Sequence, residues 1–441
     1  RRRSHTMGEK TSTGTMNSEK KILSTGIIGM GGFAAAHHRA INELEKKGMV
    51  KLCCTCDIAP ENFKQMIENL CFEKRGVEIF DNYLKMLDGC EEKLDFVTIP
   101  TPIPLHAEMH QQCVKKQIPV YLEKPPTLDY QQFISMMEVE QYATKQTNVG
   151  FNFIIQKLRH RIKQRILSNE FGNIKKITFM GQWPRPSSYF RRSSWAGKLK
   201  LNNDFVLDSC FGNAISHYVH NILFWCGKGD IFSWDPVEEV HAELYRTHDI
   251  QGTDTVFAIA STRHVNNIRI ALTHACAEKT RDIEKIYCEN AEIHFEGNAT
   301  GNNGYCAQCT IYWNNRQKEM IEEPYENLLR DNIEYYARYL LGEHQRPLIL
   351  LSDTEPFVLF NGLIYVAAKK ITQIPEQSIE RINLDNGDYF LSIKNIKEIA
   401  QKFIETGKFP SEQNIQWARS GGHAKCDQIK DLHRIIWNII S

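Results

Sequence analysis

A lysine at the end of an apolar segment is the first residue whose type and position could do chemistry. Lys124 stands in Tyr121-Leu122-Glu123-Lys124-Pro125, directly after a segment that the pattern predicts as a strand. The carboxyl ends of strands line the ligand crevice of open α/β sheets, and Pro125 would help to fix the turn. Burial or a nearby positive charge lowers the pKa of an ammonium group, so Lys124 could exchange protons near neutrality. The alternative is an ordinary charged loop after a strand.

A second group of polar residues recurs at helical spacing. Asn213, His217 and the pair His220–Asn221 follow one another at three- and four-residue intervals, so a helix would place them on one face. The side chain of Asn213 cannot titrate but can orient a hydroxyl, whereas His217 can polarise an oxygen or relay a proton. The alternative is a set of satisfied polar residues where a helix packs on a sheet.

The segment 182–197 is dense in aromatic and guanidinium groups. Aromatic faces stack on sugar rings, and arginines bind hydroxyls or a carboxylate. The residues expected to contact a substrate here are Trp183, Arg185, Tyr189 and Arg191. Because Trp, Tyr and Arg are also enriched in protein–protein interfaces, the same segment equally predicts an interface.

A glycine-rich turn near the N-terminus predicts a nucleotide site. In the segment 26–34, Gly29, Gly31 and Ala34 form G-x-G-x-x-A between an apolar strand and a helix. Gly29 would make the tight turn, Gly31 would let the backbone approach a pyrophosphate, and Ala34 would keep helix and strand close. Asp57 ends the next predicted strand, where its carboxylate would accept hydrogen bonds from the ribose hydroxyls. It would also repel a 2′-phosphate, so NAD is favoured over NADP. The alternative is a related domain that binds another nucleotide-like ligand or none.

Two patterns of elements would position these residues. From 21 to 150, short apolar runs alternate with amphipathic helical segments, which predicts a doubly wound parallel sheet, an α/β Rossmann domain. From 151 to 375, long strand-like segments with few helices between them predict an α+β domain built on a large, mainly antiparallel sheet. Residues 376–441 form a mixed tail, expected to pack on the domains as an extension.

The composition excludes several classes of function. The chain has 441 residues, enough for two or three domains, and its 54 basic and 53 acidic side chains give a formal net charge of +1. This balance gives no electrostatic reason to expect nucleic acid or an anionic membrane as a partner. No apolar run approaches the roughly 20 residues needed to cross a bilayer. Residues 1–20 lack an apolar signal core and are interpreted as a flexible leader.

The thirteen cysteines are irregularly spaced, which fits a reducing cytoplasm better than a disulfide framework. Cys306 and Cys309 form a C-x-x-C, but no second pair or nearby histidine completes a zinc site, so packing is the expected role. No group of histidines and carboxylates has metal-ligand spacing, and no metal is expected.

Four motifs together resemble those of a known family. The sequences Gly29-x-Gly31-Gly32, Thr101-Pro102-x3-His106, Glu123-Lys124-Pro125 and Gly150-Phe-Asn152 occur in the order and spacing of the Gfo/Idh/MocA family, and the resemblance spans roughly 22–371. It implies that hydride moves between NAD and a hydroxyl-bearing carbon of a sugar, glycoside or cyclitol. Lys124 would transfer the hydroxyl proton, assisted by His217.

The resemblance also implies further site residues. His217 falls on the family histidine, Asn213 replaces the usual aspartate, and Cys210 replaces a proline of a variant branch whose motif is D-S-P-x-x-N-A-x-A-H. Substrate contacts are expected from Asn152, Asn213, His220 and Asn221. The expected cofactor-binding residues are Gly29, Met30, Gly31, Gly32, Phe33, Asp57, Pro100, Thr101, His106, Glu123 and Lys124.

The resemblance leaves more than one activity open. Relatives that oxidise a sugar transiently, eliminate a neighbouring group and return the hydride suggest a redox-neutral glycosidase or epimerase with tightly bound NAD. A non-catalytic ligand sensor on the same fold is the third hypothesis, because Asn213 stands in place of an acidic residue. The antiparallel sheet commonly forms a dimer surface in the family, so a homodimer or homotetramer is expected.

Overall fold

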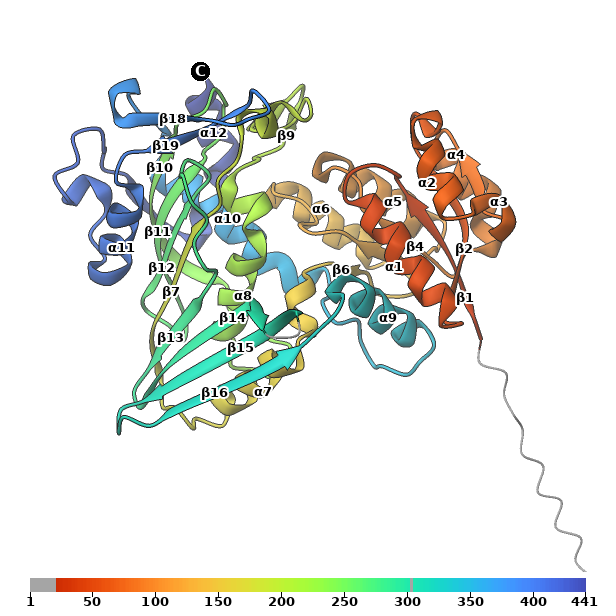
Figure 1. Ribbon diagram of the computed structural model, residues 1–441, viewed down its shortest axis with the longest axis horizontal. Coiled ribbons are helices and arrows are strands. Elements are labelled where there is room, and N and C mark those ends of the chain that lie inside the picture. The colour runs from red at the N-terminus through yellow and green to blue at the C-terminus, as the bar shows by residue number, and fades with distance from the viewer. Residues whose placement is uncertain (1–20, 302–303) are drawn as a thin grey trace, which may run out of the picture.

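The computed structural model describes residues 21–301 and 304–441, and the leader predicted for residues 1–20 lies outside them. Two sheets organise the chain, and each has helices packed on it (Figure 1). The smaller sheet belongs to the N-terminal part and the larger one to the remainder. The predicted fold class, a Rossmann domain followed by an α+β domain with a large, mainly antiparallel sheet, is confirmed.

The N-terminal sheet is parallel throughout, with strand order β3-β2-β1-β4-β5-β6. Its strands are β1 (Leu23–Ile28), β2 (Val50–Cys56), β3 (Glu78–Phe80), β4 (Phe96–Ile99), β5 (Val120–Leu122) and β6 (Asn148–Val149). The order reverses between β1 and β4, and this switch point is where doubly wound sheets bind ligands. The sequence pattern missed β3, because this edge strand is short and poorly buried.

Helices cover both faces of this sheet. They are α1 (Ala34–Lys46), α2 (Lys64–Asn69), α3 (Phe72–Arg75), α4 (Tyr83–Cys90), α5 (His106–Lys115) and α6 (Tyr130–Glu140). The distant helix α9 (Leu328–Leu340) packs against α1, where Ile333 and Tyr336 join the hydrophobic core of the N-terminal domain (Figure 1). A helix from within the predicted second domain, 151–375, therefore packs on the first and ties the two together.

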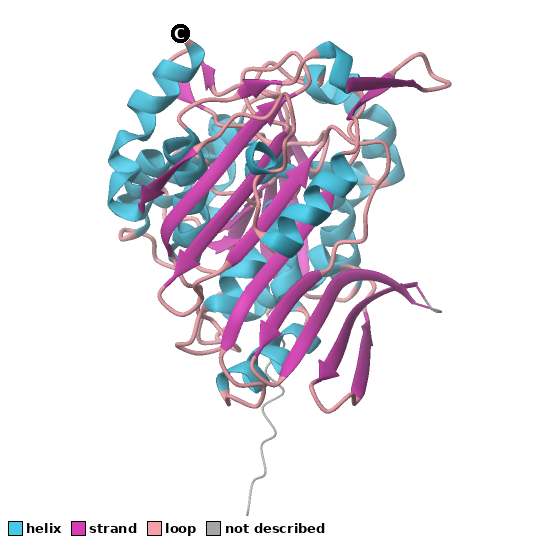
Figure 2. Cartoon of the chain, turned by 90° about the vertical axis from the view of Figure 1, so that its left-hand side faces the viewer, coloured by secondary structure: helices cyan, strands magenta, loops and turns pink. Residues whose placement is uncertain are grey.

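The large sheet has ten strands, ordered β16-β15-β14-β13-β7-β12-β11-β10-β17, with β20 also on β10. All pairs are antiparallel except β7–β12 and β10–β17. Figure 2 shows its long strands across the molecule. The strands are β7 (Ile174–Gln182), β10 (Val237–Arg246), β11 (Thr255–Thr262), β12 (Ile268–Thr273), β13 (Glu284–Cys288), β14 (Ala291–Gly301), β15 (Gly304–Trp313), β16 (Lys318–Pro324), β17 (Thr372–Gln373) and β20 (Gly422–Lys425).

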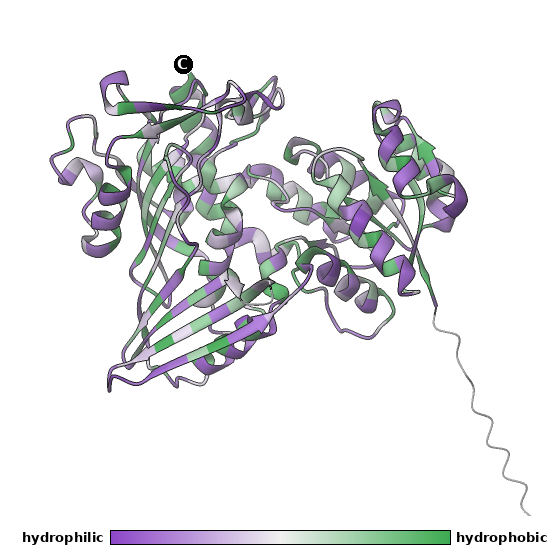
Figure 3. Ribbon diagram, viewed as in Figure 1, coloured by the Kyte–Doolittle hydropathy of each residue, from purple (hydrophilic) through white to green (hydrophobic). Residues whose placement is uncertain are grey.

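Alternating side chains explain why these segments form a sheet with two different faces. Buried and partly exposed residues alternate along β13 and most of β14, and Figure 3 shows hydrophobic and hydrophilic residues alternating along β14, β15 and β16. Helices α7 (Lys157–Leu167), α8 (Ser216–Cys226) and α10 (Glu355–Ala368) join the main apolar core of this domain.

The C-terminal tail covers a separate apolar surface of the large sheet. Helix α11 (Ile396–Thr406) packs on β7 and β12, with Phe403 against Phe257. The short hairpin β18 (Ile379–Asn383) and β19 (Tyr389–Ile393) precedes it, and α12 (Leu432–Ile440) packs on α10. The tail also supplies strand β20, so it is part of the second domain's architecture.

Within residues 21–301 and 304–441, no helix combines the length and the hydropathy that crossing a membrane requires.

Candidate active site

A cavity of about 1160 Å³ opens between the two domains. The carboxyl ends of β1, β2, β4 and β5 contribute one wall, and residues after β7 and at the start of α8 contribute another. This volume slightly exceeds the roughly 300–1,000 Å³ typical of small-molecule sites. The cavity lies at the switch point of the parallel sheet, where the sequence places the glycine turn and Lys124.

The glycine turn between β1 and α1 borders this cavity. Gly29 has a φ of +112° and Gly32 a φ of +56°, both in the region that favours glycine. A Cβ on Gly32 would meet no heavy atom within 4 Å, so this backbone faces open space, whereas a Cβ on Gly31 would approach the ring of Phe63 to 3.1 Å. The lack of a side chain at Gly31 therefore also allows the ring of Phe63 to pack closely against it.

Asp57 closes the far side of this turn. Its Oδ2 accepts a hydrogen bond of 3.1 Å from the backbone N–H of Met30, and its Oδ1 accepts one of 3.2 Å from Ala59. The carboxylate lines the cavity, while the side chain of Met30 is fully buried in the core. Only the backbone of Met30 therefore belongs to the site.

These features fit a dinucleotide. No side chain in the described part of the chain caps the N-terminus of α1, and no acidic residue stands in its first turn. The backbone N–H groups there would hold the diphosphate, and Asp57 would hold the ribose hydroxyls. The cavity contains Gly29, Gly31, Gly32, Phe33, Asp57, Pro100, Thr101, Glu123 and Lys124 from the expected cofactor set.

Lys124 lies where the two domains meet. Its Nζ donates hydrogen bonds to the backbone carbonyl of Asn213 at 2.9 Å and to Oγ of Ser216 at 3.3 Å. Burial lowers the pKa of Lys124 from its usual 10.5 to about 8. The carboxylate of Glu123 opposes this shift, and the positive charge of Arg185 adds to it. A group with this pKa can give up or take a proton near neutrality.

Glu123 is fixed behind the lysine. It is buried and accepts hydrogen bonds from Nε2 of His37 at 2.9 Å and from the backbone N–H of Lys124 at 3.1 Å. A Cβ on Gly150 would come within 2.9 Å of its Oε1, so the glycine makes room for this carboxylate. Helix α1 thus supports the turn that carries Lys124.

His217 faces the same cavity from the second domain. It lies in the first turn of α8, with its ring edge-on to Phe151 and Phe153 at centroid distances of 5.7 and 5.2 Å. Burial lowers the pKa of His217 well below its usual value, and the charge of Lys124 acts in the same direction. The imidazole is therefore neutral at physiological pH.

The segment before α8 is not regular helix. Cys210–Ala214 forms a π-helical turn, and Ile215 separates it from Ser216, where α8 begins. This irregular turn directs the carbonyl of Asn213 toward Lys124 while Asn213 itself still lines the cavity. The prediction that one helix places Asn213, His217, His220 and Asn221 on a single face is therefore wrong.

His220 and Asn221 accordingly lie away from the cavity, which corrects their expected contact with substrate. The ring of His220 stacks on Phe151 with centroids 4.0 Å apart, and both residues are fully buried. The amide nitrogen of Asn221 donates a 2.9 Å hydrogen bond to Glu284, the partner of Arg159. They are core residues of the second domain.

Two other expected site residues also lie outside the cavity lining. Arg191 points to the hydroxyl of Ser187. His106 is buried between the carbonyl oxygens of Thr101 and Pro125, at 2.8 and 2.9 Å, so it braces the two loops. The structure thus gives His106 a supporting position behind the cofactor-side loops.

The aromatic and guanidinium residues of segment 182–197 do face the cavity. Trp183 is fixed by a 2.7 Å hydrogen bond from its Nε1 to Asp282, and the guanidinium of Arg185 lies 4.7 Å from the ring centroid of Tyr189. The substrate-side residues that line the cavity as expected are Asn152, Trp183, Arg185, Tyr189 and Asn213, together with Lys124 and His217.

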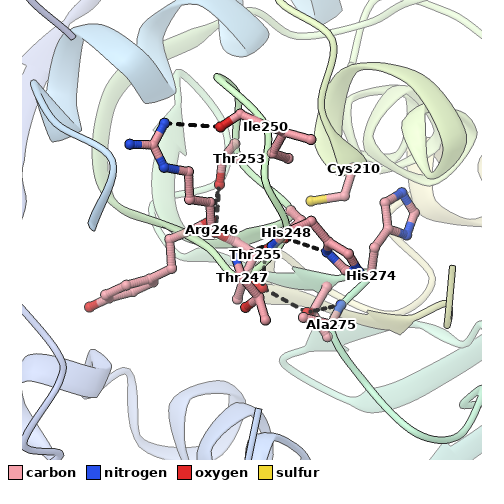
Figure 4. Close-up of polar contacts among 12 residues, drawn as sticks. Cys210, Arg246, Thr247, His248, Ile250, Thr253, Thr255, His274 and Ala275 are labelled. Atoms are coloured by element: carbon pink, nitrogen blue, oxygen red, sulfur yellow. Dashed lines mark hydrogen bonds and ion pairs between the residues drawn. The ribbon is translucent and has the colours of Figure 1, made fainter. Parts of the chain in front are cut away.

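A buried cluster that includes His248, Thr255 and His274 (Figure 4) is hydrogen-bonded to this segment. Asp254 accepts hydrogen bonds from the backbone N–H of His248 and from its Nδ1, at 2.9 and 2.7 Å. Nδ1 of His274 donates to the carbonyl of Trp183 at 2.9 Å, and the backbone N–H of Arg185 donates to the carbonyl of His274. Burial lowers the pKa of His274 to about 3, so this ring stays neutral.

Several residues of the site were not predicted from the sequence. Asp208 is buried and accepts hydrogen bonds from the backbone N–H of Gly197 at 2.6 Å and from Nδ2 of Asn213 at 2.9 Å. Burial raises the pKa of Asp208. Arg192 and Ser216 are also part of the site's surroundings, through the cavity wall and the contact to Lys124. Two sequence signals pointed to them: Asp208 and Ser209 align with the first two residues of the D-S-P-x-x-N-A-x-A-H motif, and Arg192 lies within segment 182–197.

The described residues contain no group of three or more histidine, cysteine, aspartate or glutamate side chains arranged to hold a metal ion.

Comparison with known proteins identifies the N-terminal domain. Residues 23–151 match the family model described as "Oxidoreductase family, NAD-binding Rossmann fold". Glucose-6-phosphate 3-dehydrogenase of Bacillus subtilis (strain 168) is 27% identical over 158 residues, 36% of this chain and 41% of that protein. Inositol 2-dehydrogenase of Rubrobacter xylanophilus is 24% identical over 159 residues, 36% and 43% respectively. The chain thus matches about two fifths of the length of these curated relatives.

Solved structures share the fold over more of the chain. The WlbA dehydrogenase from Bordetella pertussis, solved with NADH and UDP-GlcNAcA, has a TM-score of 0.62 and 21% identity, covering 79% of this chain and 97% of that one. KijD10, a 3-ketoreductase from Actinomadura kijaniata solved with NADP and TDP-benzene, has a TM-score of 0.65 and 16% identity, covering 80% and 100%. At these identities the likeness shows the fold.

Proposed function

Because residues 23–151 belong to the Gfo/Idh/MocA oxidoreductase family, we propose that the protein is a nicotinamide-dependent oxidoreductase. It moves a hydride between NAD and a hydroxyl-bearing carbon of a sugar, glycoside or cyclitol. One observation carries the proposal: the glycine turn, Lys124 and His217 line a single cavity although they come from different domains. The glucose-6-phosphate and inositol dehydrogenases named above support the carbohydrate class.

Lys124 is the proton-transfer group in this proposal. When bound, NAD would supply the hydride acceptor for oxidation, and its reduced form would supply the hydride for reduction. Neutral Nζ of Lys124 takes the proton from the substrate hydroxyl oxygen during oxidation, and the ammonium returns it during reduction. The carbonyl of Asn213 and the hydroxyl of Ser216 hold Nζ in place. Because the pKa lies near 8, both protonation states are accessible at neutral pH.

His217 and its neighbours orient the substrate. As a neutral imidazole it hydrogen-bonds the reacting oxygen without adding a positive charge beside Lys124. Asn152 and Asn213 offer amide groups for further hydroxyls, and Trp183 and Tyr189 offer aromatic faces for the sugar ring. These rings also exclude water from the reacting carbon.

Asp57 supports NAD as the cofactor. Its carboxylate lines the cavity at the end of β2, where the ribose of a dinucleotide lies in Rossmann domains. A 2′-phosphate would meet this negative charge, so NADP is disfavoured.

We propose a small carbohydrate-like substrate and a cytoplasmic location for the protein. Most of its thirteen cysteines are buried as free thiols, which a reducing compartment favours. The homodimer or homotetramer expected from the family stays a prediction, and the structure restricts the surface available for it. Helix α11 and the segment up to Ala418 already cover the apolar surface formed by Tyr245, Phe257 and Ala271 on the large sheet.

The test combines cofactor binding with a substrate panel. Purified protein is mixed with NAD and a range of sugars, glycosides and cyclitols, and NADH formation is followed by absorbance. We expect NADH with wild-type protein and much slower NADH formation with Lys124→Met. Turnover of sugar with copurified NAD and no net NADH would instead establish redox-neutral chemistry. NAD binding without turnover of any compound, and the same behaviour in Lys124→Met, would establish the sensor and contradict the oxidoreductase proposal.

A further inference from the structure

At the substrate end of the cavity, the guanidinium of Arg185 has neither a hydrogen-bond acceptor nor an ion-pair partner among the described residues. Its Nε is buried without a hydrogen bond, and no acidic side chain pairs with it in residues 21–301 and 304–441. Its charge instead lies over aromatic rings, 4.7 Å from the centroid of Tyr189 and 5.7 Å from that of Trp183. Both rings line the same cavity.

A second arginine packs its guanidinium on the ring of the same tyrosine. The guanidinium of Arg192 lies 3.8 Å from the ring centroid of Tyr189, and its Nη1 donates a 2.7 Å hydrogen bond to the carbonyl of that residue. Its Nη2 is 3.9 Å from a carboxylate oxygen of Asp208. Asp208 is itself already engaged by Gly197 and Asn213.

The carboxylates around this part of the cavity already have hydrogen-bond donors of their own. Arg185, Arg192 and Lys124 contribute three basic groups, whereas Glu123 accepts from His37 and from the backbone of Lys124, and Asp208 accepts from Gly197 and Asn213. A buried donor left without an acceptor costs free energy, and the cost is larger for a charged group. Such a group is stabilised when a ligand supplies the missing acceptor and the negative charge.

We propose that Arg185, together with Arg192, binds an anionic group of the substrate, a carboxylate or a phosphate, so that the substrate is an acidic sugar. The planar guanidinium fork matches both groups with paired hydrogen bonds. The proposal rests on the proposed function, because it takes the cavity as the place where the sugar is oxidised. It adds the chemical class of the substrate and the residue that selects it.

The cofactor's own phosphates have a separate place in the structure. The glycine turn and the uncapped start of α1 belong to the first domain, whereas Arg185 follows β7 in the second domain. Arg185 lines the same cavity as Lys124 and lies on its substrate side, with Trp183 and Tyr189. The anion that it binds therefore belongs to the molecule that also meets Lys124.

The experiment measures binding directly, on protein saturated with NAD. Isothermal titration calorimetry at low ionic strength compares D-glucuronate, D-glucose 6-phosphate and D-glucose, which share a ring and differ in the group on its exocyclic carbon. We expect at least one acidic sugar to bind about tenfold or more tightly than glucose, the scale of one charge-assisted hydrogen bond. A preference for glucuronate identifies a carboxylate site, and a preference for glucose 6-phosphate a phosphate site.

Variants identify the residue that is responsible for the preference for the acidic sugar. Arg185→Gln should abolish the advantage of the acidic sugar over glucose, and it should weaken NAD binding far less than it weakens binding of the acidic sugar. Arg191→Gln is the matched control, because it removes one positive charge from the same segment at a residue outside the cavity, and it should keep the preference. Arg192→Gln, which retains Arg185, should reduce the preference for the acidic sugar without abolishing it. Thermal unfolding establishes that each variant is folded, and if Arg185→Gln does not fold, Arg185→Lys must show a reduced preference.

Three results would overturn the proposal. Glucose could bind as tightly as both acidic sugars, or the preference could survive in Arg185→Gln. Arg185→Gln could also weaken NAD binding by the same factor as acidic-sugar binding, which would assign the arginine to the cofactor. Failure of wild-type protein to bind NAD is a different outcome, because it contradicts the proposed function itself.

Discussion

The ammonium group of Lys124 donates a 2.9 Å hydrogen bond to the backbone carbonyl of Asn213. This contact joins the turn after β5 in the first domain to the π-helical turn before α8 in the second. Because the acceptor is a backbone atom of an irregular turn, the position of Nζ depends on how the two domains pack. The contact thus links the packing of the domains to the protonation of the group proposed to do the chemistry.

Replacing Lys124 should remove proton transfer without removing the cofactor. We expect Lys124→Met to lower kcat by about 10²–10⁴-fold, the usual contribution of a positioned acid or base. The affinity for NAD, measured by fluorescence titration, should change little, because the glycine turn and Asp57 are untouched. Equal losses of NAD affinity and of kcat/KM would assign Lys124 to cofactor binding.

The pH dependence of the reaction should report the pKa of Lys124. With that pKa near 8, kcat/KM for oxidation should rise with pH and level off above about 8, because the neutral amine is the base. For reduction it should fall over the same range. The carboxylate of Asp208 raises the pKa and Arg185 lowers it, so Asp208→Asn should move the midpoint down and Arg185→Gln should move it up. A midpoint that neither variant moves would belong to another group.

His217 should contribute to the rate but not to this titration. The pKa of its buried imidazole lies well below its usual value, so the ring is already neutral where Lys124 titrates. We expect His217→Asn to lower kcat by about 10²-fold, typical of losing one hydrogen bond to the reacting oxygen, with the midpoint little changed. A kcat equal to that of wild type would remove His217 from the mechanism.

Asp57 should determine the preference of the protein for NAD over NADP. In Asp57→Ala, loss of the hydrogen bonds to the ribose should weaken NAD binding by about 1.5–3 kcal/mol, or roughly ten- to hundredfold. NADP should bind more tightly, because the repulsion of its 2′-phosphate is lost. Because Asp57 also accepts hydrogen bonds from Met30 and Ala59, Asp57→Asn is the control that keeps an acceptor there. Binding of both dinucleotides by calorimetry checks this. An unchanged NAD-to-NADP ratio in Asp57→Ala would show that another group makes the choice.

The buried pair Arg159–Glu284 should matter for stability. Arg159 donates two hydrogen bonds to Glu284, at 2.7 and 3.1 Å, and neither side chain is exposed. Arg159→Met would leave the carboxylate buried without its charge partner, at a cost of about 3–5 kcal/mol in the free energy of unfolding. Urea unfolding measures this. The double variant Arg159→Met/Glu284→Gln should recover part of the loss, and no recovery would mean that packing of Arg159 on Phe295 is the main contribution.

Some parts of this fold have little or no signal in the local sequence pattern. Strand β3 has three residues and lies at an edge, and β16 alternates partly and fully exposed positions, so neither has a strong apolar signal. The packing of α9 on α1 joins segments almost 300 residues apart, and no local pattern contains that contact.

The sequence alone determined the two fold classes, the glycine turn, Asp57 at a strand end, and Lys124 after another, because each depends on periodicity and turn chemistry among neighbouring residues. Tertiary structure alone decided which polar side chains share the cavity. The π-helical turn before α8 leaves His217 facing it and His220 and Asn221 in the core, and Asp208 and Arg192 join the site's surroundings. The direction of a side chain depends on the packing of segments distant in the chain, and spacing along the sequence does not contain that information.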